Sequence, residues 1–141
     1  MIVLDTDHTT LFQQSTSESG RSLREKLLNC EDRDICVTVV SLEEQMRGWL
    51  AAIRKQNDVS QQVVYYDRLI DVVHFFNPWR ILRFDEAAAE TFAALRVQRV
   101  RTGSQDLKIA SICLVNEATL LTGNTRDFET VPGLTVEDWI H

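Results

Sequence analysis

The sequence has few of the residues that cross-link or interrupt small proteins. Its 141 residues include three cysteines, five glycines, two prolines and three histidines. The cysteines form no CxxC pair and the histidines lie far apart, so we expect neither a zinc site nor a disulfide framework. With 44% hydrophobic and 26% charged residues, the composition excludes a collagen-like fibre and a disordered tail.

Long apolar runs and an excess of basic residues are also absent. No run approaches the ~20 residues of a membrane span, and Asp5 interrupts the first apolar run before a signal-peptide core could form. We therefore expect a cytoplasmic protein with no membrane partner. The net charge of −6 counts against a protein that coats DNA through a basic face. Since no linker, tail or repeat marks a boundary, we expect one domain over residues 1–141.

Short β-rich runs alternate with longer helical patterns. Strands are predicted at 2–4, 35–40, 81–84 and 118–122, and helices at 23–30, 42–55, 59–75, 86–101 and 106–117. The clearest helix carries an apolar stripe at spacings of three and four, formed by Val59, Val63, Tyr66, Ile70 and Val73. This alternation predicts an α/β fold with three α/β/α layers and a mainly parallel central sheet.

Three carboxylates are predicted at one edge of that sheet. Asp5 directly follows strand 2–4, Glu44 follows strand 35–40, and Asp106 lies in the first turn of the helix that precedes strand 118–122. The carboxyl ends of parallel strands are where such sheets bind ligands. Carboxylates gathered there repel one another unless a cation lies among them, and an all-oxygen donor set favours Mg²⁺ or Mn²⁺.

Two of these acids also have a purely structural interpretation, which the sequence leaves open. Glu44 three residues after Ser41 matches a capping box, and Asp106 could favour the helix dipole. The loop after strand 118–122 brings Asn124 and Asp127 to the same rim, where Asp127 could simply be a turn residue.

Four motifs, in this order and spacing, resemble the PIN domain of VapC-type toxins over essentially the whole chain. They are Leu4-Asp5-Thr6-Asp7, Ser41-Leu42-Glu43-Glu44, Asp106-Leu107-Lys108-Ile109-Ala110 and Thr122-Gly123-Asn124-Thr125-Arg126-Asp127-Phe128. The resemblance implies a Mg²⁺- or Mn²⁺-dependent endoribonuclease that hydrolyses RNA and acts as the toxin of a toxin–antitoxin pair. It implies Asp5, Glu44 and Asp106 as the catalytic and metal-binding acids, with Asn124 or Asp127 at a fourth position.

Two other functions compete with this one. The run 5–9 matches the DxDxT start of haloacid-dehalogenase-like phosphatases, with Asp5 as nucleophile and Asp7 as acid/base. That chemistry also needs a GDxxxD motif and a lysine after a strand, and the sequence provides neither. The other alternative is a non-catalytic PIN-like binding module.

Two groups of residues suggest partners. Arg96, Arg99, Arg101 and Lys108 place positive charge near the start of helix 106–117, which suits RNA phosphate contacts or, equally, a solvated helix end. The resemblance implies that helices 42–55 and 59–75, with Trp49, Leu50 and Tyr65, form a groove for an antitoxin segment and that the protein is a homodimer. Ordinary core packing is the alternative for these apolar residues.

Overall fold

The computed structural model describes residues 1–14, 16–32 and 34–141. Within these residues, five strands form one sheet in the order β3-β2-β1-β4-β5, and all neighbouring strands are parallel. The strands are β1 (Ile2–Leu4), β2 (Ile35–Thr38), β3 (Ile81–Leu82), β4 (Thr119–Leu121) and β5 (Thr135–Glu137). The amino-terminal strand β1 is therefore the centre of the sheet.

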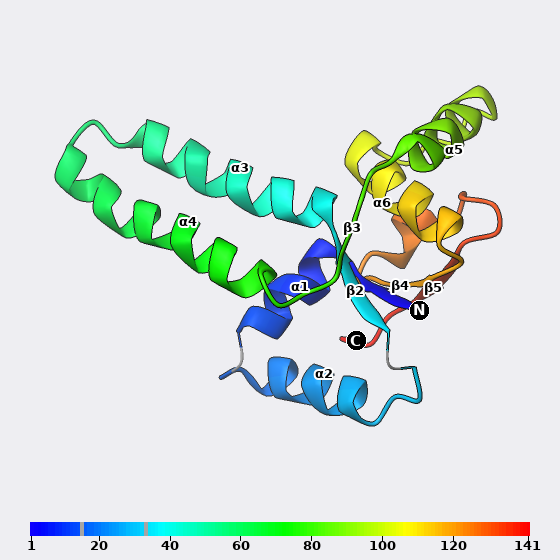
Figure 1. Cartoon of the computed structure of the whole chain (residues 1–141), viewed down its shortest axis with the longest axis horizontal. Helices are drawn as coiled ribbons and strands as arrows, with labels where there is room; N and C mark the ends of the chain where they lie inside the picture. Colours follow the sequence, from blue (N-terminus) through cyan, green and yellow to red (C-terminus); the bar gives the residue numbers. More distant parts are fainter. Residues whose placement is uncertain (15, 33) are drawn as a thin grey trace.

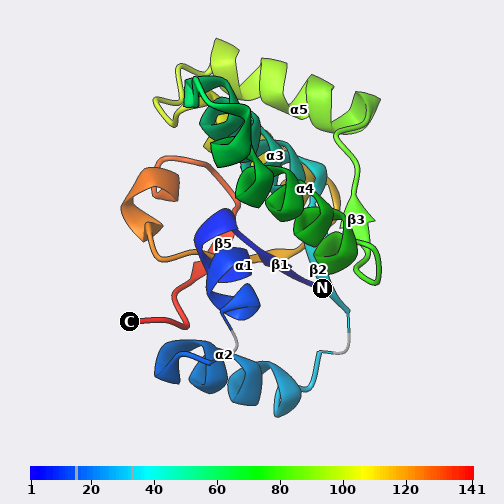
Figure 2. The same ribbon diagram turned by 90° about the vertical axis from the view of Figure 1, so that its left-hand side faces the viewer.

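Helices cover both faces of this sheet. The helices α1 (Thr6–Gln13), α2 (Glu18–Leu28) and α4 (Val63–Phe76) pack on one face, and α5 (Glu86–Val97) and α6 (Ser104–Val115) pack on the other. Figure 2 shows the sheet between α5 above and α2 below. The long helix α3 (Val39–Lys55) and α4 lie side by side and project from the sheet as an arm (Figure 1). The predicted three-layer α/β/α fold with a parallel sheet is confirmed.

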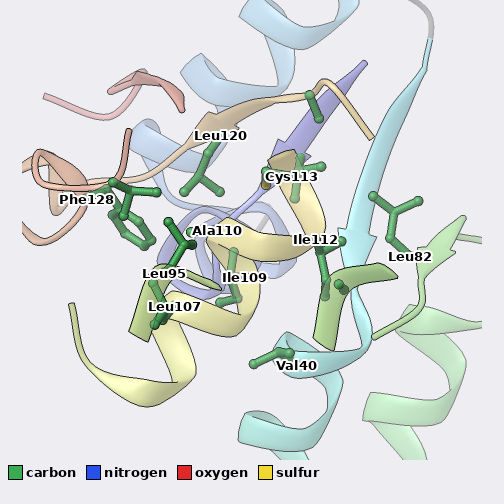
Figure 3. Close-up of a cluster of buried hydrophobic side chains, with 14 of the residues drawn as sticks. Val40, Leu82, Leu95, Leu107, Ile109, Ala110, Ile112, Cys113, Leu120 and Phe128 are labelled. Atoms are coloured by element: carbon green, nitrogen blue, oxygen red, sulfur yellow. The ribbon is translucent and has the colours of Figure 1, made fainter. Parts of the chain in front are cut away.

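Strand side chains alternate between two cores. Val3 and Leu120 face the α5–α6 side, whereas Leu4 and Leu121 face the side of α1, α2 and α4. The apolar helix α6 fills the first core, as Figure 3 shows, with fully buried side chains at Leu107, Ile109, Ala110, Ile112 and Cys113. The sequence predicted this deep position because α6 is apolar nearly all round.

Several element boundaries differ from the prediction. Strand β2 ends at Thr38 because the Thr38 hydroxyl accepts from the Ser41 amide (3.2 Å) and caps α3, which begins at Val39. The helix predicted over 86–101 ends at Val97, and Arg99 adopts a positive φ of 60°. Helix α1, strand β5 and the short 3-10 helix η2 (Thr125–Phe128) were not predicted. The first four residues of the helix predicted over 59–75 form a separate 3-10 helix, η1 (Val59–Gln62).

The apolar stripe of α4 and η1 lies on the outside of the molecule. Val59, Val63, Tyr66, Ile70 and Val73 are each between 53% and 74% exposed. The core side of α4 is instead formed by Val72 and Phe76. Core packing is therefore the wrong interpretation of the stripe, because helical periodicity shows that an apolar face exists but not what covers it.

Two aromatic residues join the helices of the arm. Trp49 on α3 stacks on Tyr65 of α4, with ring centroids 6.1 Å apart and ring planes at 27°. Both side chains are half-buried, so they hold α3 against α4, while Leu50 is exposed. No helix in the described part of the chain has the length and apolarity needed to cross a membrane.

Candidate functional site

The order in which strands are added to the sheet reverses direction once, at β1. The reversal point lies at the edge of the sheet where the strands end. The chain runs outward from β1 to β2 and β3, and later returns to place β4 on the other side of β1. Leu4 pairs with Leu121, and the Asp5 amide donates to the Leu121 carbonyl at 2.9 Å. Asp5 and Thr122 therefore lie side by side, each directly after the last residue of one of two neighbouring strands. Parallel sheets bind ligands at such reversal points.

Asp5 lies at this point and is almost completely buried, with 6% of its surface exposed. Its Oδ1 accepts from the Thr6 amide at 2.7 Å, which caps α1, and its Oδ2 accepts from the Thr122 hydroxyl at 2.8 Å. Burial raises the pKa of Asp5 to about 6 although both hydrogen bonds lower it, and the negative charges of Asp7 and Asp106 raise it further. The carboxylate is thus fixed in position and costly to ionise.

Glu44 reaches the same edge from α3. Its Oε2 accepts from the Thr6 hydroxyl at 2.7 Å, and this hydroxyl also lies 3.1 Å from the Ser41 hydroxyl. The capping-box interpretation of Glu44 is wrong, because Thr38 caps the helix and α3 has no acidic residue in its first turn. Glu44 is instead linked to the residue that directly follows Asp5.

Asp106 approaches from the amino-terminal turn of α6. Burial raises its pKa, and the negative charges of Asp127, Glu44 and Asp7 raise it further. The helix dipole favours a carboxylate at this position, but desolvation and neighbouring acids outweigh that effect. The structure therefore brings Asp106 and Glu44 within electrostatic reach of each other, as the topology predicted.

Asp7 fastens α1 to the loop that follows β4. Its Oδ2 accepts from the Gly123 amide at 2.8 Å, and its Oδ1 accepts from the His8 amide at 2.7 Å and lies 3.1 Å from His8 Nδ1. Burial alone would raise the pKa of Asp7, but the hydrogen bonds from His8 and Gly123 hold it below its ordinary value. His8 is buried, and its Nε2 accepts from the Trp139 amide at 3.4 Å.

These contacts do not suit the phosphatase alternative. Both carboxylate oxygens of Asp5 already accept hydrogen bonds, and both oxygens of Asp7 are held by the backbone. Two lysines are directed elsewhere, since Lys26 donates to the Trp139 carbonyl and Lys108 donates to Gln105. These residues therefore do not form a free nucleophile with a lysine beside it to balance the charge of a phosphate.

The two candidates for the fourth position differ in what they face. Asn124 is exposed, and its amide donates to the Thr122 hydroxyl at 3.1 Å. Asp127 acts electrostatically on Asp106 and lines the same cavity of about 370 Å³. Thr6 and Thr122 were missed as site residues, although the position of Thr122 directly after a strand matches that of Asp5.

The four basic candidates have different surroundings. The Arg96 guanidinium donates to the carbonyls of Val100 (3.4 Å) and Thr102 (3.1 Å), so it holds its own loop. Lys108 donates to Gln105, and Arg99 lies beyond the end of α5. Arg101 lines the cavity that contains Asp106.

The donor set fits a hydrated hard cation. Across residues 1–14, 16–32 and 34–141, no three His, Cys, Asp or Glu side chains stand close enough to enclose a metal ion. Asp5, Glu44 and Asp106 nevertheless offer carboxylate oxygens to one edge of the sheet, and Asp106 interacts with both of the others. Magnesium keeps several waters and uses one or two protein carboxylates, which matches acids that are near but not in contact.

Comparisons with known proteins give a consistent picture. No protein-family model matches the chain. The chain is 25% identical over 116 residues to ribonuclease VapC2 of Rickettsia felis, covering 79% of each protein. It is 24% identical over 141 residues to the tRNA(fMet)-specific endonuclease VapC of Salmonella typhimurium, covering 97% of this chain and 96% of that protein.

A solved structure adds the fold. The DNA-bound VapBC complex of Salmonella typhimurium contains a chain that superposes with a TM-score of 0.74 at 25% identity, over 98% of this chain and 97% of that one. The match extends over the central sheet and the helices on both faces. In both sequence and fold, the chain is therefore similar to VapC proteins.

Proposed function

We propose that this protein is a divalent-metal-dependent endoribonuclease and the toxin of a toxin–antitoxin pair. The observation that carries the proposal is the meeting of Asp5, Glu44 and Asp106, from three separate parts of the chain, at the reversal point of a parallel sheet. The names of the two relatives, a ribonuclease and a tRNA endonuclease, support the choice of RNA as substrate.

Asp5 and Asp106 would hold the cation directly and Glu44 would act through a bound water, and we expect the cation to be Mg²⁺ or Mn²⁺. When bound, such an ion lowers the pKa of a coordinated water and polarises a phosphate oxygen. A cation also removes the cost of crowding these acids, because opposite charge lowers a carboxylate pKa that burial and like charges have raised. The burial and mutual repulsion of these acids thus favour the binding of a divalent ion.

The side chains and backbone amides around the acids orient them and the attacking water. The Thr6 amide and the Thr122 hydroxyl hold the two oxygens of Asp5, so this carboxylate keeps one orientation. The Thr6 hydroxyl fixes Oε2 of Glu44 and leaves Oε1 to orient the attacking water and accept its proton. Asp127 or Asn124 completes the polar rim; the electrostatic influence of Asp127 on Asp106 favours Asp127.

The catalytic assignment is tested by two isosteric variants with a neighbouring control. Asp5→Asn and Glu44→Gln should each lower Mg²⁺-dependent RNA cleavage by about 100-fold or more, the usual contribution of a positioned acid or base. The control is Glu43→Gln, on the same helix, whose carboxylate contacts Arg47 and Gln105 instead. Circular dichroism verifies that each variant folds. Full activity of Asp5→Asn would refute the assignment.

The arm formed by α3 and α4 is the proposed antitoxin surface. An apolar groove of about 680 Å³ runs along α3 and is lined by Val39, Leu42, Met46 and Leu50 among others. Exposed apolar area of this extent commonly marks a protein-binding surface. The Salmonella relative was solved as a VapBC complex, which supports an antitoxin as the occupant.

Co-expression tests this partner. The product of a small upstream gene, if it encodes a DNA-binding protein, should relieve the toxicity of the wild-type protein. Leu50→Lys should abolish that relief without changing cleavage of RNA by the purified protein. Leu28→Lys, at an 80% exposed position on α2, is the control and should be neutralised normally. Light scattering on the purified protein would measure the expected homodimer. Equal neutralisation of both variants would exclude the groove.

A further inference from the structure

We propose that Arg101 and Arg126 form a phosphate-binding cleft beside the acidic site, which receives the RNA backbone next to the phosphate that is cleaved. The inference rests on the proposed ribonuclease function and adds a substrate-positioning site to it. Of these two residues, Arg126 was not among the basic residues that the sequence suggested for RNA contacts.

The cleft is a cavity of about 370 Å³ at the amino-terminal end of α6. Two segments far apart in the sequence form its walls: Arg101 and Thr102 precede α6, and Arg126, Asp127 and Thr130 follow β4. Asp106 connects this cavity with the acidic site, because it lines the cavity and interacts electrostatically with Asp5. A group bound here is therefore adjacent to the proposed reaction centre.

The two walls are held together by buried contacts. The buried Thr102 hydroxyl donates to the Asp127 carbonyl at 2.9 Å and lies 3.4 Å from the Thr130 hydroxyl. On the other side, the Arg96 guanidinium donates to the Thr102 carbonyl at 3.1 Å and lies over the Phe92 ring. The spacing between the two walls is thus fixed before any ligand binds, which reduces the entropy cost of binding.

The two cleft arginines differ from five other arginines of this protein, whose guanidinium groups already have partners. Arg47, Arg68 and Arg80 form ion pairs, and Arg24 and Arg96 donate to backbone carbonyls. In the described part of the chain, neither Arg101 nor Arg126 has an ion pair or a side-chain hydrogen bond, although both lie beside Asp106 and Asp127 in the cavity lining. Their five guanidinium donors each remain available.

Phosphate is the ligand that this chemistry favours. A guanidinium binds phosphate oxygens through two parallel hydrogen bonds, and phosphate carries the charge that two cations can balance. The chain as a whole has a net charge of −6, so binding of a polyanion needs local positive groups of this kind. A carboxylate of the antitoxin is the competing ligand, but the apolar groove on α3 lies on other residues and suits that protein better.

The test measures RNA binding separately from cleavage. In the Asp5→Asn background without divalent ions, Arg101→Gln and Arg126→Gln should each weaken binding of a short single-stranded RNA by about tenfold. Each should also lower the slope of log affinity against log salt by about one. Arg21→Gln on α2, which removes an exposed arginine distant from the cleft, is the matched control and should leave both values unchanged.

Cleavage by the metal-loaded protein provides the second measurement. With Asp5 intact, each glutamine variant should raise KM by a factor about ten times larger than the factor by which it changes kcat. Arg126→Lys should recover only part of the loss, because lysine keeps the charge but not the bidentate geometry. A merely structural arginine would not produce this split.

The outcomes separate the two proposals. If wild-type protein cuts no RNA while the arginine variants still weaken RNA binding, the proposed catalysis fails and the cleft stands. If cleavage is confirmed but RNA affinity and salt slope match those of Arg21→Gln, the cleft is refuted. It is also refuted if the variants lose affinity for the antitoxin and keep full affinity for RNA.

Discussion

Replacing Asp5 with asparagine should stabilise the folded protein at neutral pH even though we expect it to abolish RNA cleavage. Asp5 is buried and 6% exposed, and its pKa is raised from 3.8 to about 6. Each unit of pKa shift corresponds to about 1.4 kcal/mol, so ionised Asp5 costs roughly 3 kcal/mol of folding free energy. Asparagine avoids that cost and still offers Oδ1 to the Thr6 amide.

The pH dependence has a definite sign. Below pH 3.8 the carboxyl is protonated in both the folded and the unfolded chain, so the raised pKa has no effect on stability there. Between pH 3.8 and about 6 the unfolded chain loses this proton first, and wild-type stability falls as the pH rises. The advantage of Asp5→Asn should therefore grow through this window and stay constant above it.

Denaturant and thermal unfolding from pH 4 to pH 8 measure the difference. At pH 7.5 the variant should unfold at a temperature roughly 10 °C higher, the shift that about 3 kcal/mol produces in a protein of this size. Asp67→Asn changes an exposed carboxylate on α4 and should alter stability by less than about 0.5 kcal/mol.

Magnesium should cancel most of this difference. A ligand present at 100 times its Kd stabilises the protein that binds it by about 2.7 kcal/mol. Wild-type protein should gain stability with added Mg²⁺, while Asp5→Asn should gain little. A variant that is no more stable than wild type at pH 7.5, or a difference that does not change between pH 4 and pH 7, would refute the assigned burial cost.

Two further substitutions test contacts around the site. Gly123→Ala should destabilise the protein by about 1–3 kcal/mol, because the added Cβ would lie 2.6 Å from Asp7 Oδ2. Gly48→Ala on α3 is the control: its Cβ would meet no atom within 4 Å, so it should stabilise the protein by about 0.5–1 kcal/mol. Equal denaturation midpoints for the two would contradict this reasoning. Thr6→Val should lower kcat about tenfold by freeing Glu44, and Thr6→Ser should restore it; a serine variant as slow as the valine variant would rule out the hydroxyl.

The edge at which the acids meet could be predicted because it depends on topology alone. Parallel strands joined by helices direct every strand end to one side, so Asp5, Glu44 and Asp106 could be placed together without any side-chain contact. Their partners could not be placed in this way. The hydrogen bond from Thr122 to Asp5 depends on the register of β1 against β4, which the sequence does not specify.

The missed elements share a physical cause. Strand β5 is an edge strand with exposed Thr135 and Glu137, so it lacks the apolar pattern by which strands are predicted. Helix α1 is short and begins at the cap provided by Asp5, which the sequence analysis assigned to chemistry alone. The cap of α3 was misplaced for a related reason, since Thr38 and Ser41 are both suitable caps and only the end of β2 decides between them.

The central position of β1 has a consequence for how the protein is made. Asp5 is synthesised well before its hydrogen-bond partner Thr122, which is 117 residues later in the sequence. Strand β1 likewise cannot complete its pairing until β4 has been synthesised. Because contacts of such separation form late, the acidic edge cannot assemble on a partly translated chain. A nascent chain therefore cannot complete the acidic edge before β4 and Thr122 have been synthesised.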